Sequence, residues 1–312
     1  MINSKLAEEN PTKLRAQDFR LPDETRIGYV RLQVSNLERS LHFYESLMGM
    51  KRVRSAGTSS ILSASGAAPY HILLSELPGA IPKPAHSSGL YHVAYRFPHR
   101  RELAKVFHRM YTRNAVFQGF SDHLVSEAIY LADPDENGVE LYSDRPRADW
   151  TRRNNQIEMA TMPLDLDGLV AELGKGNAGD TDIDPNSDVG HVHLHVSDLG
   201  TSEEFYHGLL GFDVTQRSYP GALFLSAGGY HHHIGVNVWA GKGAPPPPPE
   251  AAGLLGVGIY VPDQKTIETL ARRFREAGVD SSIRKDEVLG TELLRILSPD
   301  KLPIEFFTNP AK

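Results

Sequence analysis

Two stretches of the chain, residues 28–50 and 190–212, carry the same residues in register. The first contains Gly28, Val30, Leu32, Val34, Ser35, Leu37, Ser40, Phe43, Tyr44, Leu47 and Gly49, and the same amino acids follow Gly190 at the same spacing up to Gly211. Chance does not give a match of this extent, and similarity at a fixed separation is the mark of a repeat architecture. The two halves of the chain are therefore copies of one fold.

Each copy begins as a strand that leads into a helix. Residues 27–34 alternate as in a half-buried strand, and a capping box from Ser35 to Glu38 opens a helix that ends at Gly49. A fainter repeat relates residues 89–98 to residues 253–262, and each of these strands precedes a helix, predicted at 101–113 and at 265–277. Short strands separated by turns follow these helices, at 128–132, 139–143, 293–297 and 303–308. The pattern predicts an α+β fold of four βαβββ modules.

The repeats and the composition between them set the expected boundaries. We expect a polar leader at 1–25, an N-terminal domain at 26–145 with modules 26–80 and 87–145, a linker at 146–187, and a C-terminal domain at 188–310 with modules 188–241 and 252–310. The linker holds one amphipathic segment at 164–173, which favours a single helix. The oligoproline run from Pro245 to Pro249 predicts a stiff, extended loop between the third and fourth modules.

Composition narrows the classes of partner. The chain has 312 residues, 40% of them hydrophobic, a net charge of −6 and no long basic run, so nucleic acid and acidic membrane surfaces are not expected partners. It has no apolar stretch of about 18 residues and no apolar signal core, which predicts no membrane span and a cytoplasmic location. There is no cysteine but there are 14 histidines, so a bound metal would need His, Asp or Glu ligands.

Three histidines alternate along the strand predicted at residues 190–196. Because neighbouring side chains on a strand point to opposite faces, His191, His193 and His195 share one face. Three imidazoles are costly in an apolar core, and they favour a polar cavity or a metal site. A surface strand with solvated histidines is the alternative.

These motifs, together with Asp133-Pro134-Asp135 and Gly138 to Tyr142, resemble the vicinal oxygen chelate superfamily. With the run Gly229 to Gly235, they are similar to the catechol-2,3-dioxygenase branch of its two-domain extradiol dioxygenases, over residues 27 to 308. The resemblance implies modules that pair into two cup-shaped mixed-sheet barrels. It also implies a ferrous ion, Fe(II), or alternatively Mn(II), held by two His and one Glu, a catechol-type aromatic diol and O2 as substrates, and a homo-oligomer.

The resemblance also implies where the metal ligands lie. The usual pattern takes them from the third and fourth modules, where they fall on His191, Gly256 and Glu305, but Gly256 has no side chain to bind a metal. The second module carries His92 and Glu140 at the corresponding positions. We therefore expect His92, Glu140 and His191 to bind the metal in a cup formed by modules two and three. Modules one and four would form a metal-free cup, in which Tyr29 and Gly256 replace the histidines.

Further roles follow from the same resemblance. It places an acid–base histidine at His232, on the last strand of module three, with His231 and His233 facing away, although a register one residue off stays open. His123 and Tyr130 would hydrogen-bond the substrate or oxygen. Three more residues have expected positions: Tyr142 beside Glu140, and His193 and His195 in the cup lining. Arg96 shares a face with His92, either as a supporting partner or as a solvated strand end.

The expected function is ring cleavage next to the vicinal diol, as in a catechol 2,3-dioxygenase of aromatic catabolism, with a 2-hydroxymuconic semialdehyde as product. Two alternatives stay open at this point. A glyoxalase-like metal-dependent lyase or isomerase would normally use four protein ligands, whereas the expected cup offers three and His232. A non-catalytic small-molecule-binding protein of the same superfamily would usually lack the ligands.

Overall fold

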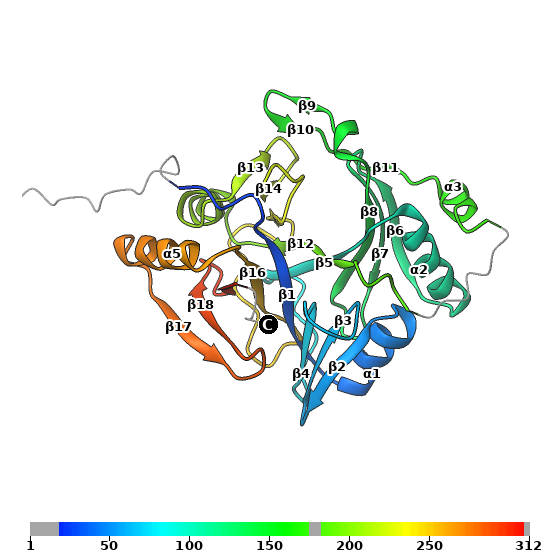
Figure 1. The fold of residues 1–312 in the computed structure, drawn as a ribbon, viewed down its shortest axis with the longest axis horizontal. Helices are drawn as coiled ribbons and strands as arrows, with labels where there is room; N and C mark the ends of the chain where they lie inside the picture. Colours follow the sequence, from blue (N-terminus) through cyan, green and yellow to red (C-terminus); the bar gives the residue numbers. More distant parts are fainter. Residues whose placement is uncertain (1–18, 175–181, 309–312) are drawn as a thin grey trace, which may run out of the picture.

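The computed structural model describes residues 19–174 and 182–308, and their strands form two large mixed sheets (Figure 1). The first sheet has eight strands in the order β17 (Ser281–Asp286), β18 (Thr291–Leu297), β19 (Pro303–Phe307), β16 (Gly253–Tyr260), β1 (Arg26–Val34), β4 (Ile72–Glu76), β3 (Ser59–Ser63) and β2 (Lys51–Ala56). The second has nine, in the order β11 (Met162–Pro163), β6 (Phe117–Asp122), β7 (Ser126–Ala132), β8 (Gly138–Asp144), β5 (Gly89–Phe97), β12 (Asp188–His195), β15 (Ile234–Asn237), β14 (Ala222–Ser226) and β13 (Asp213–Gln216).

Each sheet takes one module from each half of the chain. Strand β5 of the second module lies antiparallel to β12 of the third, and β1 of the first module lies antiparallel to β16 of the fourth. The strand order therefore confirms the expected pairing of module two with module three, and of module one with module four. The expected α+β fold is confirmed as well.

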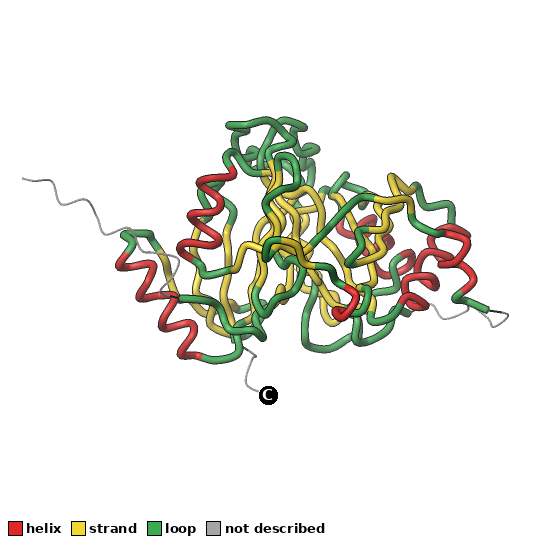
Figure 2. The backbone as a smooth tube through the Cα atoms, turned by 90° about the horizontal axis from the view of Figure 1, so that it is seen from above, coloured by secondary structure: helices red, strands yellow, loops and turns green. Residues whose placement is uncertain are grey.

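Two long helices lie close to their predicted ranges, α2 at Arg100–Thr112 and α5 at Gln264–Glu276. The side chain of Asp263 caps α5 by accepting a hydrogen bond from the backbone N–H of Thr266, and Gly278 follows the helix with a φ of 66°. The buried face of α5 includes Leu270 and Phe274. Figure 2 shows most of the helices towards the two ends of the molecule, with strands between them.

The helix predicted after β1 differs from expectation in two ways. It begins as α1 (Leu37–Leu41) with Asn36 as its cap, because the hydroxyl and backbone N–H of Ser35 bond Asp135 instead. It then widens into the π-helical segment η2 (His42–Leu47). The second copy repeats this change from α4 (Leu199–Glu203) to η4 (Glu204–Leu209), so the wider turn belongs to the repeated fold.

The segment predicted as a linker carries several short elements. They are η3 (Arg147–Asp149), the hairpin of β9 (Arg152–Arg153) and β10 (Gln156–Ile157), β11, and α3 (Leu166–Ala171), which lies within the predicted helical segment. Strand β11 pairs with β6, and the side chain of Gln216 donates to the carbonyl of Ile157 at 3.1 Å. The segment is thus packed against strands of both modules of the nine-stranded sheet.

Most of the expected leader, residues 1–18, lies outside the described residues, as do residues 175–181 of the linker and the last four residues. None of the helices in the ranges 19–174 and 182–308 combines the length and apolar character needed to cross a membrane.

Candidate metal centre

Three side chains from adjacent strands meet in the nine-stranded sheet. His92 lies on β5, Glu140 on β8 and His191 on β12, and β5 is the strand between the other two. The Nε2 atom of His92 lies 2.9 Å from Oε2 of Glu140, and the Nε2 atom of His191 lies 3.2 Å from the same oxygen. One ligand atom from each residue lies within 4.8 Å of the others, and all three side chains are buried.

Strand register and one close contact bring these residues together. The parallel pairing of β5 with β8 places Glu140 beside Ala94, which lies two residues along β5 from His92. The antiparallel pairing of β5 with β12 places His92 beside His193, which lies two residues along β12 from His191. A side chain at Gly190 would put its Cβ 1.7 Å from the hydroxyl of Tyr142, so only glycine allows this approach just before His191.

Tyr142 lies on the same face of β8 as Glu140, but its side chain contacts other residues. Its hydroxyl lies 2.7 Å from that of Tyr230, and its ring packs on His191 with centroids 5.0 Å apart. The strand alternation places Tyr142 and Glu140 on one face correctly. The longer tyrosine side chain reaches past the carboxylate, however, and contacts the neighbouring module.

The protonation of His191 and Glu140 suits a divalent metal ion. Burial lowers the pKa of His191 to about 4, so its imidazole is neutral near pH 7. Burial acts to raise the pKa of Glu140, but the imidazoles of His191 and His92 outweigh it and hold that pKa well below its ordinary value. The set is therefore two imidazoles and one carboxylate, which is the facial ligand set of non-haem ferrous oxygenases.

Two buried ring nitrogens in this group, Nε2 of His92 and Nδ1 of His191, have no hydrogen-bond partner among the described residues. The Nε2 atom of His92 makes no hydrogen bond with any described residue, because its contact with Glu140 lacks hydrogen-bond geometry. A buried polar atom without a partner is costly, and a metal ion placed between the imidazoles and the carboxylate would remove that cost for His92. The three residues fit the ferrous ion that the family resemblance implies.

A cavity of about 390 Å³ opens beside the three residues. The three other residues predicted to act in catalysis, His123, Tyr130 and His232, all line it. The Nε2 atom of His123 lies 2.7 Å from the hydroxyl of Tyr130, and the other ring nitrogen of His123 lies 2.6 Å from the carbonyl of Ala160. Burial and the charge of Glu140 raise the pKa of Tyr130 well above its ordinary value, so its hydroxyl stays protonated.

The three consecutive histidines do not lie on a strand as expected. They form an irregular segment just before β15, which begins at Ile234, and within the described residues only His233 keeps backbone hydrogen bonds to the neighbouring strands, at Leu225 and Val192. The middle imidazole, His232, still faces the cavity, with its ring centroid 4.0 Å from that of His191. His231 contacts Asp144, and His233 accepts a hydrogen bond from the backbone N–H of Ala227. Burial and the neighbouring imidazoles keep the pKa of His232 well below its usual value.

The remaining expected residues divide between the cavity and its surroundings. His193 lines the cavity and accepts a hydrogen bond from the side chain of Asn237 at 3.0 Å. His195 lies further out, where its Nδ1 atom is 2.7 Å from Oδ1 of Asn237. Arg96 is a supporting residue, with ion pairs of 2.7 Å to Asp188 and 3.3 Å to Asp144.

Several residues line the cavity although no pattern in the sequence predicted it. An aromatic wall is formed by Tyr91, Tyr219, Phe224 and Trp239, and the expected linker contributes Met159, Ala160 and Thr161. Aromatic residues at strand ends and in loops are common, so their convergence is visible only once the modules are paired. The prediction of a linker at residues 146–187 likewise gave no reason to expect Met159, Ala160 and Thr161 at the cavity.

The corresponding position in the eight-stranded sheet is filled by the protein itself. The hydroxyl of Tyr29 donates to Glu305 at 2.9 Å, and Arg31 contacts Glu305 at 2.8 Å and Asp286 at 2.6 Å. The ring of Tyr29 occupies the space that a side chain at Gly258 would need. Within the described residues, His92, Glu140 and His191 form the one group of three or more side chains placed to bind a metal.

Known proteins share both this fold and much of this sequence. The model of the Glyoxalase/Bleomycin resistance protein/Dioxygenase superfamily matches residues 26–141 and 188–306. A relative named Catechol-2,3-dioxygenase, from Bacillus subtilis (strain 168), is 41% identical over 285 residues, which cover 88% of this chain and 98% of the relative.

Two solved structures show the same architecture at low identity. A provisionally named dioxygenase from Bacillus subtilis subsp. subtilis str. 168 gives a TM-score of 0.66 at 12% identity, covering 94% of this chain and 87% of that one. Glyoxalase I from Zea mays gives a TM-score of 0.55 at 16% identity, covering 92% and 93%. These likenesses support the fold, while the family follows from the sequence matches. The chain belongs to the Glyoxalase/Bleomycin resistance protein/Dioxygenase superfamily.

Proposed function

We propose that this protein is an iron-dependent extradiol dioxygenase that inserts O2 into a catechol ring next to its vicinal diol. The observation that carries the proposal is the convergence of His92, Glu140 and His191 on the wall of a cavity lined by aromatic side chains. The 41% identical relative named Catechol-2,3-dioxygenase supports the same reaction.

The buried triad would hold Fe(II), with Mn(II) as the alternative ion. When bound, the ion would lower the pKa of the diol and hold diol and O2 side by side for the oxidation. The two neutral imidazoles and one carboxylate leave a single negative protein charge at the centre, and they occupy one side of it. The cavity on the other side provides the room for both reactants.

His232 would take the proton that the diol releases. Its low pKa keeps the imidazole neutral before the reaction, and its ring lies beside that of the ligand His191. A neutral imidazole facing the reactants is the usual general base at neutral pH. The same ring would return the proton to the product.

Tyr130 and His123 would act as a hydrogen-bonding pair on the opposite wall. The hydroxyl of Tyr130 remains protonated and lies near His92, with ring centroids 5.7 Å apart. Because His123 is fixed by the carbonyl of Ala160, it holds the hydroxyl of Tyr130 in one orientation. With Nδ1–H of His123 donated to that carbonyl, the hydroxyl of Tyr130 donates to Nε2 of His123, and its oxygen is left to accept a hydrogen bond from a substrate hydroxyl without a rearrangement.

The test compares one residue from each sheet. Wild type, His92→Ala and Glu305→Gln are purified anaerobically, iron is measured, and oxygen uptake and the ring-cleavage product are followed on adding catechol. We expect wild type and Glu305→Gln to bind about one iron per chain and to consume oxygen, because Glu305 belongs to the filled cup. His92→Ala should lose both the bound iron and the oxygen uptake.

Two results would overturn the proposal. If Glu305→Gln loses iron while His92→Ala keeps it, the ligand assignment is wrong. If wild type binds iron in the triad but consumes no oxygen with any catechol, the protein is not a dioxygenase and a lyase or a binding protein takes its place.

A further inference from the structure

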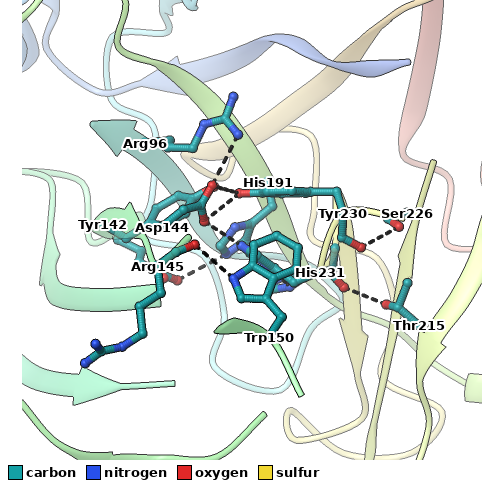
Figure 3. A network of polar contacts seen from close by, with 12 residues as sticks. Arg96, Tyr142, Asp144, Arg145, Trp150, His191, Thr215, Ser226, Tyr230 and His231 are labelled. Carbon is teal, nitrogen blue, oxygen red and sulfur yellow. Dashed lines mark hydrogen bonds and ion pairs between the residues drawn. The ribbon is translucent and has the colours of Figure 1, made fainter. Parts of the chain in front are cut away.

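We infer that Asp144 and His231 are positioning residues that hold His232 in a single tautomer, with the unprotonated nitrogen Nε2 turned to the cavity. The inference rests on the proposed acid–base role of His232, and it adds two residues, both outside the cavity lining, to the reaction. It is carried by a chain of contacts that runs from Asp144, at the end of β8, through the fully buried imidazole of His231 to His232 at the cavity. Figure 3 shows the first two of these residues, Asp144 and His231.

The chain has three members joined by two short contacts. The Nε2 atom of His231 lies 2.9 Å from Oδ1 of Asp144, and its Nδ1 atom lies 2.8 Å from the Nδ1 atom of His232. The side chain of His231 has no exposed surface, whereas the ring of His232 lines the cavity. One imidazole thus connects a carboxylate to the nitrogen of His232 that faces away from the reactants.

The hydrogen positions follow from the carboxylate. Burial would raise the pKa of Asp144, but His231 and Arg96 outweigh it and lower that pKa, so Asp144 is ionised and can only accept. In the proposed arrangement His231 carries hydrogen on Nε2 alone, donates it to Asp144 and presents the lone pair of Nδ1 to His232. Because Nδ1 of His232 lies 2.8 Å from this lone pair, Nδ1 of His232 must carry the hydrogen of the contact. The Nε2 atom of His232 is left as the acceptor, which is the form a general base needs.

The surroundings hold His231 in place from all sides. Its ring packs against Tyr230, with centroids 4.0 Å apart, and against Trp150 at 5.3 Å. Its carbonyl accepts a hydrogen bond of 2.6 Å from Thr215 on β13. Figure 3 includes these residues together with Asp144. The ring therefore cannot turn to offer Nε2 to His232 without breaking several contacts.

Asp144 is equally constrained. The hydroxyl of Tyr230 lies 3.1 Å from both of its oxygens, and Arg96 lies 3.3 Å from Oδ2. Arg96 is in turn paired with Asp188 at 2.7 Å. A carboxylate with these partners stays in one orientation, in the same way that a carboxylate behind a catalytic histidine selects its tautomer in other enzymes.

Substitutions at His231 and its neighbour separate positioning from packing. His231→Phe keeps a ring but removes both nitrogens, His231→Gln restores one donor and one acceptor, and His233→Phe makes the same change on the other side of His232. His233 is buried and has its own backbone partner, so His233→Phe is a matched control for the loss of a buried imidazole.

Steady-state kinetics with catechol give the first result. We expect His231→Phe to lower kcat on the order of 10²-fold, with iron content and KM close to wild type, because only the tautomer of the base is disturbed. His231→Gln should recover most of kcat, and His233→Phe should keep it. An unchanged kcat in His231→Phe, or an equal loss in His233→Phe, would overturn the inference.

A second measurement does not depend on activity. In the full chain loaded with diamagnetic Zn(II) and labelled with 15N-histidine, NMR reports which ring nitrogen of His232 carries hydrogen. We expect hydrogen on Nδ1 in wild type and on Nε2 in His231→Phe. Hydrogen on Nε2 in wild type would refute the inference even if the protein cleaves catechol, whereas an inactive wild type with hydrogen on Nδ1 would refute only the proposed function.

Discussion

Removing Arg31 should destabilise the protein strongly without touching the metal centre. Arg31 pairs with Glu305 and Asp286 inside the eight-stranded sheet, and the side chains of the three residues are 17%, 4% and 20% exposed. In Arg31→Met the apolar stem stays and the charge is lost. The carboxylate of Glu305 would then be buried with an incomplete set of partners.

The expected cost follows from the partners that remain. Breaking a buried ion pair from one side typically costs about 3–5 kcal/mol, because the other charge is left uncompensated. Glu305 would keep the hydroxyl of Tyr29 at 2.9 Å and a longer contact of 3.6 Å with the half-exposed Arg295. We therefore expect a loss of about 3 kcal/mol, at the lower end of that range.

Urea unfolding at neutral pH, followed by circular dichroism, measures this free energy. The double variant Arg31→Met/Glu305→Gln is the informative control, since it removes the stranded charge together with its partner. The double variant should recover about half or more of the free energy of unfolding that Arg31→Met loses. A cost below about 1 kcal/mol for Arg31→Met, or a double variant that is less stable than the single one, would refute the view that this ion pair is buried and balanced.

Two further predictions concern pH and substrate charge. Burial lowers the pKa of His71 to about 4, below its unfolded value, so the unfolded state alone binds this proton as pH falls from about 6.5 to about 4. Wild type should lose about 2 kcal/mol more than His71→Gln between pH 7 and pH 5 in urea unfolding, and parallel losses would contradict this. No Lys or Arg is among the described residues that line the cavity, and Glu140 is their single carboxylate. We therefore expect kcat/KM for 3,4-dihydroxybenzamide to exceed that for the isosteric 3,4-dihydroxybenzoate by at least about tenfold. Equal values would contradict this, because they would require a cationic group that balances the carboxylate of the bound substrate.

The sequence was most informative where a rule of alternation or repetition applied. The repeat predicted four modules, and the absence of a ligand at Gly256 led to the pairing of modules that the strand order shows. His92, Glu140 and His191 each lie inside a regular strand, so the period of two was enough to choose the face. The structure brings together the three residues that the family resemblance indicated, and their role as ligands stays a proposal.

The same rules failed where the backbone leaves regular geometry. The irregular segment from His231 to His233 contacts residues that are distant in sequence, among them Asp144 and Thr215, so no local pattern could show it. The π-helical turns after α1 and α4 have amphipathic sequences like those of ordinary helices. The aromatic wall and the contribution of residues 159–161 depend on how two modules pack, which is information that a single strand or loop does not contain.

The exchange of modules between the halves bears on how such a chain could arise. A single half would leave β1 and β5 each with one open edge, because one partner of each strand, β16 for β1 and β12 for β5, lies in the other half. Two separate copies of that half would have to associate to close both sheets, and symmetry would then give two equivalent metal centres. Joining the copies into one gene would free each centre to mutate alone. One could then keep its three ligands, while the other kept only its glutamate, which a tyrosine and an arginine now bind.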